Sequence, residues 1–303
     1  MRLRSKELRI ETTSKCNAKC IMCPREKMTR PLVTMPTGHF KYLASQGHAL
    51  GVQTVSLFGH GEPLLDNELS DKIRYCSEAQ FDTFITSNAS LLSPDSSYEL
   101  LEAGLSHIRF SAHGFGDNYN KVHSGLSWLR FLENVGEFLR VRNELDSDCA
   151  VSVSVIPMHG EDVETIRRFW EPLVDFLEVW KPHNWADGRE YRSKTVKRKK
   201  TCGRPESGPI QIQADGLVIV CCWDYDGKMV VGDTNKNTLE EILQSEAFDE
   251  IRHRHKIGDH TGLLCEHCDQ LNVETESPLL YSNRDYSREP GRLSSTKIKL
   301  KEK

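Results

Sequence analysis

The sequence predicts an α/β fold, in which a short barrel or an open, curved parallel sheet is followed by a small C-terminal α+β domain. From residue 7 to about residue 182, short runs rich in β-branched residues alternate with longer helical runs. This alternation is typical of βαβ units and a parallel sheet. After Pro182 the chain becomes polar and rich in glycine and proline, which indicates a linker before a second unit.

Six segments of the first part are predicted strands: residues 8–12, 54–59, 83–88, 107–113, 150–156 and 176–180. Helical runs separate them, among them residues 67–79, 93–104, 128–145 and 162–174. Six strands and about six helices fall short of the eight repeats and roughly 250 residues of a complete barrel. The sheet is therefore expected to stay incomplete.

The second part contains a predicted hairpin and one predicted helix. Two short apolar runs flank Asp215-Gly216, which is a hairpin signal. Residues 238–255 predict a single amphipathic helix, with Thr238 as N-cap and Glu241 completing a capping box. From residue 273 the chain is polar and is expected to be loop-like and partly mobile. The predicted domains are residues 1–182, a linker 183–201, residues 202–272 and an extension 273–303.

The composition excludes several classes of protein. Of the 303 residues, 38% are hydrophobic and 28% charged, and the formal net charge is −4, so no global basic field recruits nucleic acid. The basic run 194–200 lacks interleaved aromatic residues and is interpreted as solvated linker. No apolar run is long enough to cross a membrane, and the N-terminus lacks the apolar core of a signal peptide. A cytoplasmic location is therefore expected.

Ten cysteines in a cytoplasmic chain indicate metal or redox chemistry, because that compartment keeps thiols reduced. Cys16, Cys20 and Cys23 directly follow the first predicted strand, and the C-terminal ends of parallel strands carry active sites. Three thiolates suit an iron–sulfur cluster or zinc, but a structural zinc site would need a fourth ligand close by. An incomplete set leaves one coordination position open for chemistry.

The CxxxCxxC spacing, with Met22 before the last cysteine, resembles the signature of radical S-adenosylmethionine (SAM) enzymes. The resemblance implies a partial (β/α)6 TIM barrel and a 4Fe–4S cluster that is held by the three cysteines and binds SAM at its open iron. In that family the reduced cluster cleaves SAM to a 5′-deoxyadenosyl radical, which abstracts a hydrogen atom from the substrate. An external one-electron reductant such as flavodoxin or ferredoxin is also implied.

Further positions match this family residue by residue. Gly61, Glu62 and Pro63 match a segment that binds the methionine amino group, with His60 where a glycine is usual. The resemblance places three polar residues near the ribose or the methionine carboxylate, namely Ser87, Asn88 and Ser111. It places Met22 and Ile156 near the adenine, with Val155 either beside them or in the core. His113 is a candidate substrate contact or a structural residue.

A second cysteine group, Cys202, Cys221, Cys265 and Cys268, can close a metal site completely. The residues alone do not separate zinc from a cluster. The pattern Cys-x13-Gly-x4-Cys, followed later by Cys-x2-Cys, resembles the SPASM module, and because no cysteine follows Cys268 it resembles the shortened twitch form. The resemblance implies an auxiliary 4Fe–4S cluster with four protein ligands, which fits electron transfer.

Cys222 adjoins a predicted ligand, and neighbouring side chains of a strand point to opposite faces. It is interpreted as a buried structural cysteine, as a hydrogen-atom donor to the substrate like that of related radical epimerases, or as the ligand in place of Cys221. Cys76 and Cys149 are expected to be core or surface thiols without a role.

Two reactions fit this set of residues. One is a dehydrogenation, resembling the twitch enzyme that oxidises an aminocyclitol, and the other is an epimerisation in which Cys222 returns hydrogen. Both suggest a small polar, sugar- or cyclitol-like substrate, with Arg189 and Arg192 as candidate ligands. A peptide or protein substrate is the alternative, weakened because the first strand begins so close to Met1. A non-catalytic iron–sulfur or zinc redox sensor is a further alternative, against which Gly61-Glu62-Pro63 and the open cluster argue.

Overall fold

A curved sheet of ten strands organises the described part of the chain, which is residues 5–187, 189–191, 197–273 and 278–284 of the computed structural model. The strand order is β11-β10-β9-β1-β3-β4-β5-β7-β8-β12. The six central strands are parallel, as predicted: β1 (Glu7–Ile10), β3 (Thr54–Ser56), β4 (Asp82–Ser87), β5 (His107–Ser111), β7 (Ala150–Val155) and β8 (Phe176–Trp180). Because β1 and β8 are not neighbours, the barrel is partial.

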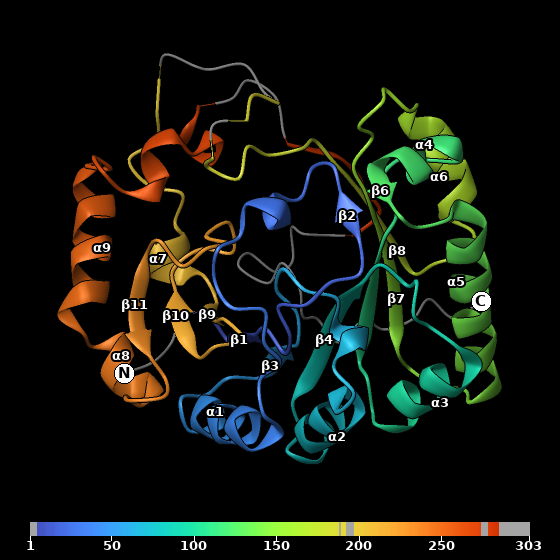
Figure 1. Cartoon of the computed structure of the whole chain (residues 1–303), viewed down its shortest axis with the longest axis horizontal. Coiled ribbons are helices and arrows are strands. Elements are labelled where there is room, and N and C mark those ends of the chain that lie inside the picture. Colours follow the sequence, from blue (N-terminus) through green and yellow to red (C-terminus); the bar gives the residue numbers. More distant parts are fainter. Residues whose placement is uncertain (1–4, 188, 192–196, 274–277, 285–303) are drawn as a thin grey trace.

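The helices of this first part cover the outer side of the sheet, as Figure 1 shows for α1, α2, α3 and α5. Their bounds are α1 (Thr37–Ala49), α2 (Leu69–Glu78), α3 (Pro94–Glu102), α4 (Asp117–Val122), α5 (Trp128–Glu144) and α6 (Val163–Trp170). Local sequence fixes their starts: Ser93 forms a capping box with Ser96 ahead of α3, and Asp162 accepts the N–H of Thr165 ahead of α6.

Charged side chains alternate with apolar ones on the central strands. Leu8 and Ile10 of β1 are fully buried in the core, and Arg9 between them points to the opposite, inner face. On β5, Phe110 lies in the core and Arg109 takes the inner face. Parallel strands with both faces covered normally read as continuous apolar runs, so this alternation marks the inner face as a polar site.

The C-terminal part continues the same sheet. Strand β9 (Ile210–Ile212) pairs in parallel with β1, and β10 (Leu217–Ile219) and β11 (Val230–Asp233) follow it in antiparallel order. The predicted hairpin at Asp215-Gly216 is confirmed, and Gly216 adopts the positive φ of +92° that the turn requires. The short helix α7 (Arg204–Ser207) precedes β9.

The single helix predicted for residues 238–255 is wrong, because two helices lie there: α8 (Leu239–Leu243) and α9 (Glu246–Ile257). Ser245 is the N-cap of α9 and accepts the N–H of Phe248 at 3.3 Å, which ends one helix and starts the next. The predicted capping box of Thr238 and Glu241 is confirmed.

The expectation of a loop beyond residue 273 is also wrong in part. Strand β12 (Leu279–Ser282) pairs antiparallel with β8 and forms the other edge of the sheet. The N–H of Lys181 extends this pairing by donating to the carbonyl of Pro278 at 2.8 Å. This polar segment forms a strand because the edge of β8 presents backbone N–H and C=O groups that need hydrogen-bond partners, and β12 supplies them.

None of the helices within the described ranges combines the length and apolar character that a membrane crossing requires.

Replacement of Lys72 by methionine is expected to lower the free energy of unfolding by about 3–5 kcal/mol. The Lys72 ammonium lies 2.5 Å from the Asp66 carboxylate and 2.9 Å from the Met35 carbonyl, and both charged side chains are fully buried. The substitution leaves Asp66 as an unpaired buried charge. Denaturant unfolding under anaerobic conditions measures the loss.

The matched control is Lys236→Met at the exposed pair with Asp233, which is expected to cost less than about 1 kcal/mol. Equal losses in the two variants would contradict the assignment of the buried pair.

Candidate active site

The loop with Cys16, Cys20 and Cys23 leaves the C-terminal end of β1 and is tied down on both sides. The Ser14 side chain accepts the N–H of Val33 at 2.8 Å and donates to the carbonyl of Pro31 at 3.0 Å. Within the loop, β2 (Lys19–Cys20) pairs with β6 (His123–Ser124) in a second, two-stranded sheet. The cysteine loop is therefore held by backbone pairing rather than left free.

The three thiols lie close enough to act on one another. Burial raises the pKa of Cys20 strongly, and the neighbouring Cys23 and Cys16 raise it further. The pKa of Cys23 is likewise raised, first by burial and also by Cys16. Three mutually repelling buried thiolates need a cationic partner, and soft sulfur donors suit the irons of a cluster. The residues present fit the implied 4Fe–4S cluster.

The segment Gly61-Glu62-Pro63 packs against the chain just before the cysteines. A Cβ on Gly61 would lie 2.0 Å from the carbonyl oxygen of Thr13, so only glycine fits this approach. The N–H of Glu62 donates to the carbonyl of Lys15 at 2.8 Å. The predicted neighbourhood of this segment and the first cysteine loop is thus present.

Ser87 and Asn88, predicted to lie near the nucleotide, hydrogen-bond to Glu62 instead of standing free. The Ser87 hydroxyl donates to Glu62 Oε1 and the Asn88 N–H to Glu62 Oε2, both at 2.7 Å. The Asn88 amide also donates to Asn17 in the cysteine loop at 3.0 Å. Burial nevertheless raises the pKa of Glu62 to about 7, so a cationic ligand beside it would stabilise the carboxylate.

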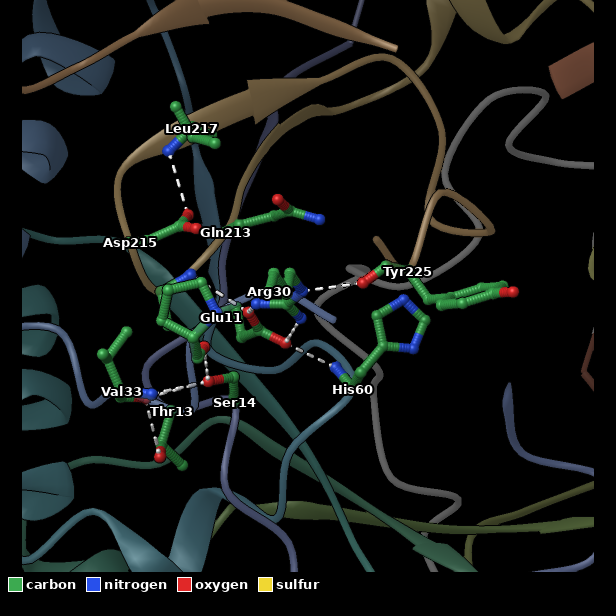
Figure 2. Close-up of polar contacts among 12 residues, drawn as sticks. Glu11, Thr13, Ser14, Arg30, Val33, His60, Gln213, Asp215, Leu217 and Tyr225 are labelled. Carbon is green, nitrogen blue, oxygen red and sulfur yellow. Dashed lines mark hydrogen bonds and ion pairs between the residues drawn. The ribbon is translucent and has the colours of Figure 1, made fainter. Parts of the chain in front are cut away.

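A buried ion pair joins these segments to the C-terminal part (Figure 2). The two terminal nitrogens of the Arg30 guanidinium each donate to the Glu11 carboxylate at 2.7 Å. Glu11 also accepts the N–H of His60 at 2.7 Å and that of Ala214, in the β9–β10 turn, at 3.0 Å. Arg30 Nε donates to the carbonyl of Tyr225 at 2.7 Å. Arg30 and Glu11 thus connect both cysteine-bearing regions.

The other predicted nucleotide contacts lie around the same end of the sheet. Met22 is buried, and its carbonyl accepts hydrogen bonds from Trp185 Nε1 at 2.7 Å and from Arg189. Ser111 ends β5 half-buried, and the carbonyl of Ile156, just beyond β7, accepts the N–H of Gly114 at 3.1 Å.

The remaining sequence candidates fall into three groups. Val155 is fully buried in the core, as are the thiols of Cys76 and Cys149. The Nδ1 atom of His113 is buried without a hydrogen-bond partner in the described part of the chain. Arg189 contacts the cysteine loop, whereas Arg192 lies outside the described residues.

The second cysteine group also brings thiols together. Burial, then the neighbouring thiols, raise the pKa of Cys265 to about 11 and that of Cys268 to about 12, with Cys202 acting on both. The charge of the Arg204 guanidinium interacts most strongly with Cys222, and with Cys221 and Cys202 as well. No three histidine, cysteine or carboxylate side chains among the described residues meet as a single-ion site. The four thiols fit the larger auxiliary cluster.

The expectation that Cys221 and Cys222 point to opposite faces of a strand is wrong. Strand β10 ends at Ile219, so Cys221 and Cys222 lie beyond it, where each thiol shifts the pKa of the other. Cys222 also lines a cavity of about 50 Å³ over β1, β9 and β10, together with Arg9, Phe58 and His60. The cavity places the Cys222 thiol on the inner side of the sheet, which its interpretation as a hydrogen-atom donor requires.

Sequence reasoning missed two arginines on the inner face. Arg9 lies over the Phe58 ring at 4.9 Å and Arg109 over the Phe84 ring at 5.0 Å. The Nε atom of each guanidinium is buried and has no hydrogen-bond partner among the residues described. The sequence signal that could have identified Arg9 is a charged residue between two apolar ones, Leu8 and Ile10, in a strand predicted to be central.

The chain belongs to the radical SAM superfamily, whose profile matches residues 10–171, and the SPASM iron–sulfur cluster-binding domain matches residues 202–269. It is therefore a radical SAM enzyme that uses SAM, a 4Fe–4S cluster and an additional iron–sulfur cluster. The prediction of an enzyme rather than a redox sensor is confirmed.

Curated relatives share part of the chain. A probable GTP 3′,8-cyclase of Archaeoglobus fulgidus is 29% identical over 50% of this chain and 47% of its own length. The GTP 3′,8-cyclase of Aquifex aeolicus is 29% identical over 59% of each chain. A PqqA peptide cyclase of Rhodopseudomonas palustris is 29% identical over 35% of this chain and 28% of its own length. The matches thus cover between 28% and 59% of the lengths of these relatives.

Solved structures share the fold over most of the chain. BtrN in complex with AdoMet and 2-DOIA has a TM-score of 0.62 at 20% identity, covering 93% of this chain and 100% of its own. The enzyme anSMEcpe with AdoMet and the Cp18Cys peptide has a TM-score of 0.66 at 14% identity, covering 90% and 92%. SuiB of Streptococcus suis bound to precursor peptide SuiA has a TM-score of 0.59 at 16% identity, covering 82% and 66%.

Glu62 is expected to make stability depend on pH in a defined direction. Its pKa rises from 4.5 to about 7 in the folded protein, so the folded state holds the proton more tightly than the unfolded chain. The resulting stabilisation is present below pH 4.5 and is lost as the pH rises through about 7, by at most roughly 3 kcal/mol. Denaturant unfolding between pH 5 and 8 measures this loss.

In Glu62→Gln the side chain stays neutral, so this part of the pH dependence should vanish. An infrared titration of the wild type should show the protonated carboxyl band disappearing near pH 7. Parallel pH profiles of the two proteins would contradict the raised pKa.

Proposed function

We propose that this enzyme abstracts a hydrogen atom from a small polar, sugar- or cyclitol-like substrate and that the reaction ends as a dehydrogenation or an epimerisation. The observation that carries the proposal is the cavity of about 50 Å³ on the inner face, where Arg9, His60 and Cys222 meet. A charged group, a titratable ring and a thiol at one place suit a substrate with several hydroxyl or amino groups.

The residues proposed to hold the cofactors are those at the C-terminal end of the sheet and in the second cysteine group. Cys16, Cys20 and Cys23 would hold the first cluster, and Cys202, Cys221, Cys265 and Cys268 the auxiliary one. The proposed SAM contacts are Met22, Gly61, Glu62, Pro63, Ser87, Asn88, Ser111 and Ile156. When bound, SAM and the first cluster would supply a 5′-deoxyadenosyl radical, and the auxiliary cluster would supply an electron acceptor. The proposed domains remain the barrel at residues 1–182, the linker 183–201, the auxiliary-cluster domain 202–272 and the extension 273–303.

The chain's own residues would orient the substrate and exchange its hydrogen. Arg9 and Arg109 offer guanidinium N–H groups from the inner face to substrate oxygens. In an epimerisation, Cys222 gives the hydrogen atom of its thiol to the substrate radical and then regains one electron and one proton. In a dehydrogenation, one hydrogen atom, one proton and one electron leave a carbinol and a ketone results. In both cases an external one-electron reductant such as flavodoxin or ferredoxin is proposed as the source of electrons.

Modification of a peptide or protein is the second candidate. It is favoured by the structures of SuiB with precursor peptide SuiA and of anSMEcpe with the Cp18Cys peptide, which share the fold of this chain. In such a reaction the same inner face would receive one side chain of the peptide. A substrate screen should therefore contain aminocyclitols, sugars, peptides and GTP.

The test is turnover of the anaerobically reconstituted enzyme in deuterated water. A substrate should convert uncoupled 5′-deoxyadenosine formation into stoichiometric turnover. Epimerisation installs solvent deuterium at one carbon, whereas dehydrogenation creates a carbonyl. Stoichiometric turnover of peptides alone would overturn the small-molecule proposal in favour of the second candidate.

Cys222→Ala and Cys221→Ala are expected to separate hydrogen return from cluster binding. Cys222→Ala should keep about eight irons per chain and still form 5′-deoxyadenosine. If the reaction is an epimerisation, this variant should lose deuterium incorporation by about 100-fold or more, because no thiol reaches the substrate radical.

Cys221→Ala should retain only about four irons, because the auxiliary site loses a ligand. Iron counting and product analysis by mass spectrometry check both variants. Loss of iron from Cys222→Ala alone would show that the ligand is Cys222.

A further inference from the structure

We infer that His123 is a positioning residue for the first cluster: its Nδ1–H donates a hydrogen bond to the Cys20 sulfur and thereby raises the reduction potential of that cluster. The register, the hydrogen-bond partners and the burial of His123 lead to this role, and none of them depends on the identity of the substrate.

Backbone pairing places the two side chains together. In the two-stranded sheet of β2 and β6, Cys20 and His123 are direct register partners. The N–H of Ile21 donates to the carbonyl of Val122 at 2.9 Å and extends the same pairing. His123 Nδ1 consequently lies 3.1 Å from Cys20 Sγ.

The second ring nitrogen determines where the proton lies. The backbone N–H of His113 donates to His123 Nε2 at 3.1 Å, so Nε2 is an acceptor and carries no hydrogen. A neutral imidazole has one N–H, which must then be on Nδ1. The contact with Cys20 is therefore an N–H donor aimed at sulfur, since the thiolate has only lone pairs to offer.

The ring cannot turn away from this arrangement. His123 is 1% exposed and is stacked on Tyr119 at 4.3 Å and on His113 at 5.4 Å. Gly114, with φ of +79°, makes the turn that brings the His113 N–H to the ring, and a Cβ there would lie 2.8 Å from the carbonyl of Asn118.

A hydrogen bond to a ligating thiolate withdraws negative charge from it. This favours the reduced, more negative state of a cluster, so hydrogen bonds to sulfur are one of the means by which proteins set cluster potentials. His123 thus makes the first cluster easier to reduce without occupying its open position.

The auxiliary group provides an internal control. His255 Nε2 lies 3.4 Å from Cys265 Sγ, and its Nδ1 lies 3.1 Å from the Thr201 hydroxyl. That hydroxyl accepts the N–H of Gly203 at 3.0 Å, which leaves its own proton for His255 Nδ1. His255 should therefore act on the auxiliary cluster as His123 acts on the first.

The experiment is a potentiometric titration of the anaerobic holoenzyme followed by electron paramagnetic resonance. The first cluster is identified as the one whose signal changes when SAM is added. His123→Phe keeps the stacked ring and removes the donor. Its first cluster is expected to have a reduced-to-oxidised ratio about tenfold lower at a given potential, or 59 mV for one electron, with the auxiliary cluster unchanged.

Two further variants make the result specific. His123→Asn places an amide N–H near the position of Nδ1 and should recover part of the shift. His255→Phe should move the auxiliary potential alone. An unchanged potential of the first cluster in His123→Phe with iron retained, or equal shifts of both clusters, would overturn the inference.

A measurement that does not need a stable His123 variant completes the test. In His255→Phe labelled with ¹⁵N-histidine, the reduced first cluster should show a hyperfine coupling to one histidine nitrogen. Absence of that coupling would equally overturn the inference, whatever the stability of the His123 variants.

Discussion

The buried ion pair of Glu11 and Arg30 is the contact on which the arrangement of both cysteine groups depends. Burial alone would raise the pKa of Glu11, but the hydrogen bonds and charge of Arg30, with His60 nearby, hold it below its ordinary value. Removing two charges from water is costly, and the cost is met only when every lone pair and proton finds a partner. Here Glu11 and Arg30 also bind His60, Ala214 and Tyr225. The pair therefore fixes three loops at once.

The polar inner face follows from the same constraint. In an ordinary parallel sheet covered on both sides, a charge such as that of Arg9 would be expelled. Here the strands leave one face without a layer of helices, and Arg9 and Arg109 spread their charge over the rings of Phe58 and Phe84. Each arginine is also paired with a buried carboxylate, Arg9 with Glu7 at 2.9 Å and Arg109 with Glu178 at 3.3 Å.

Much of the fold could be predicted from the sequence because its signals are local. The six strands, the capping box at Thr238 and the hairpin at Gly216 each depend on a few adjacent residues. The cysteine spacings identified the family for the same reason. Strand β12 escaped prediction because it depends on the open edge of β8, and the break at Ser245 was overlooked although the N-cap that makes it is a local signal. The relation of Cys221 to Cys222 depended on where β10 ends.

The candidate site was predictable where a motif lies within one segment and not where distant segments meet. Ser87 and Asn88 were correctly placed at a strand end, but their bonds to Glu62 require two loops to be brought together. His123 carries no signal at all in the sequence, since its partner Cys20 is 103 residues away. Arg9 was visible only as an exception to an apolar pattern.

The parallel pairing of β9 with β1 makes the auxiliary region part of the same hydrogen-bonded sheet as the first strand of the barrel. A hinge between two separately folded bodies would let the gap between their redox centres vary with every fluctuation. A shared sheet instead fixes the distance between the two cysteine-bearing regions, because increasing that distance requires breaking backbone hydrogen bonds. Electron tunnelling falls off steeply with separation, so any electron transfer between the two clusters would depend on the register in which β9 and β1 pair.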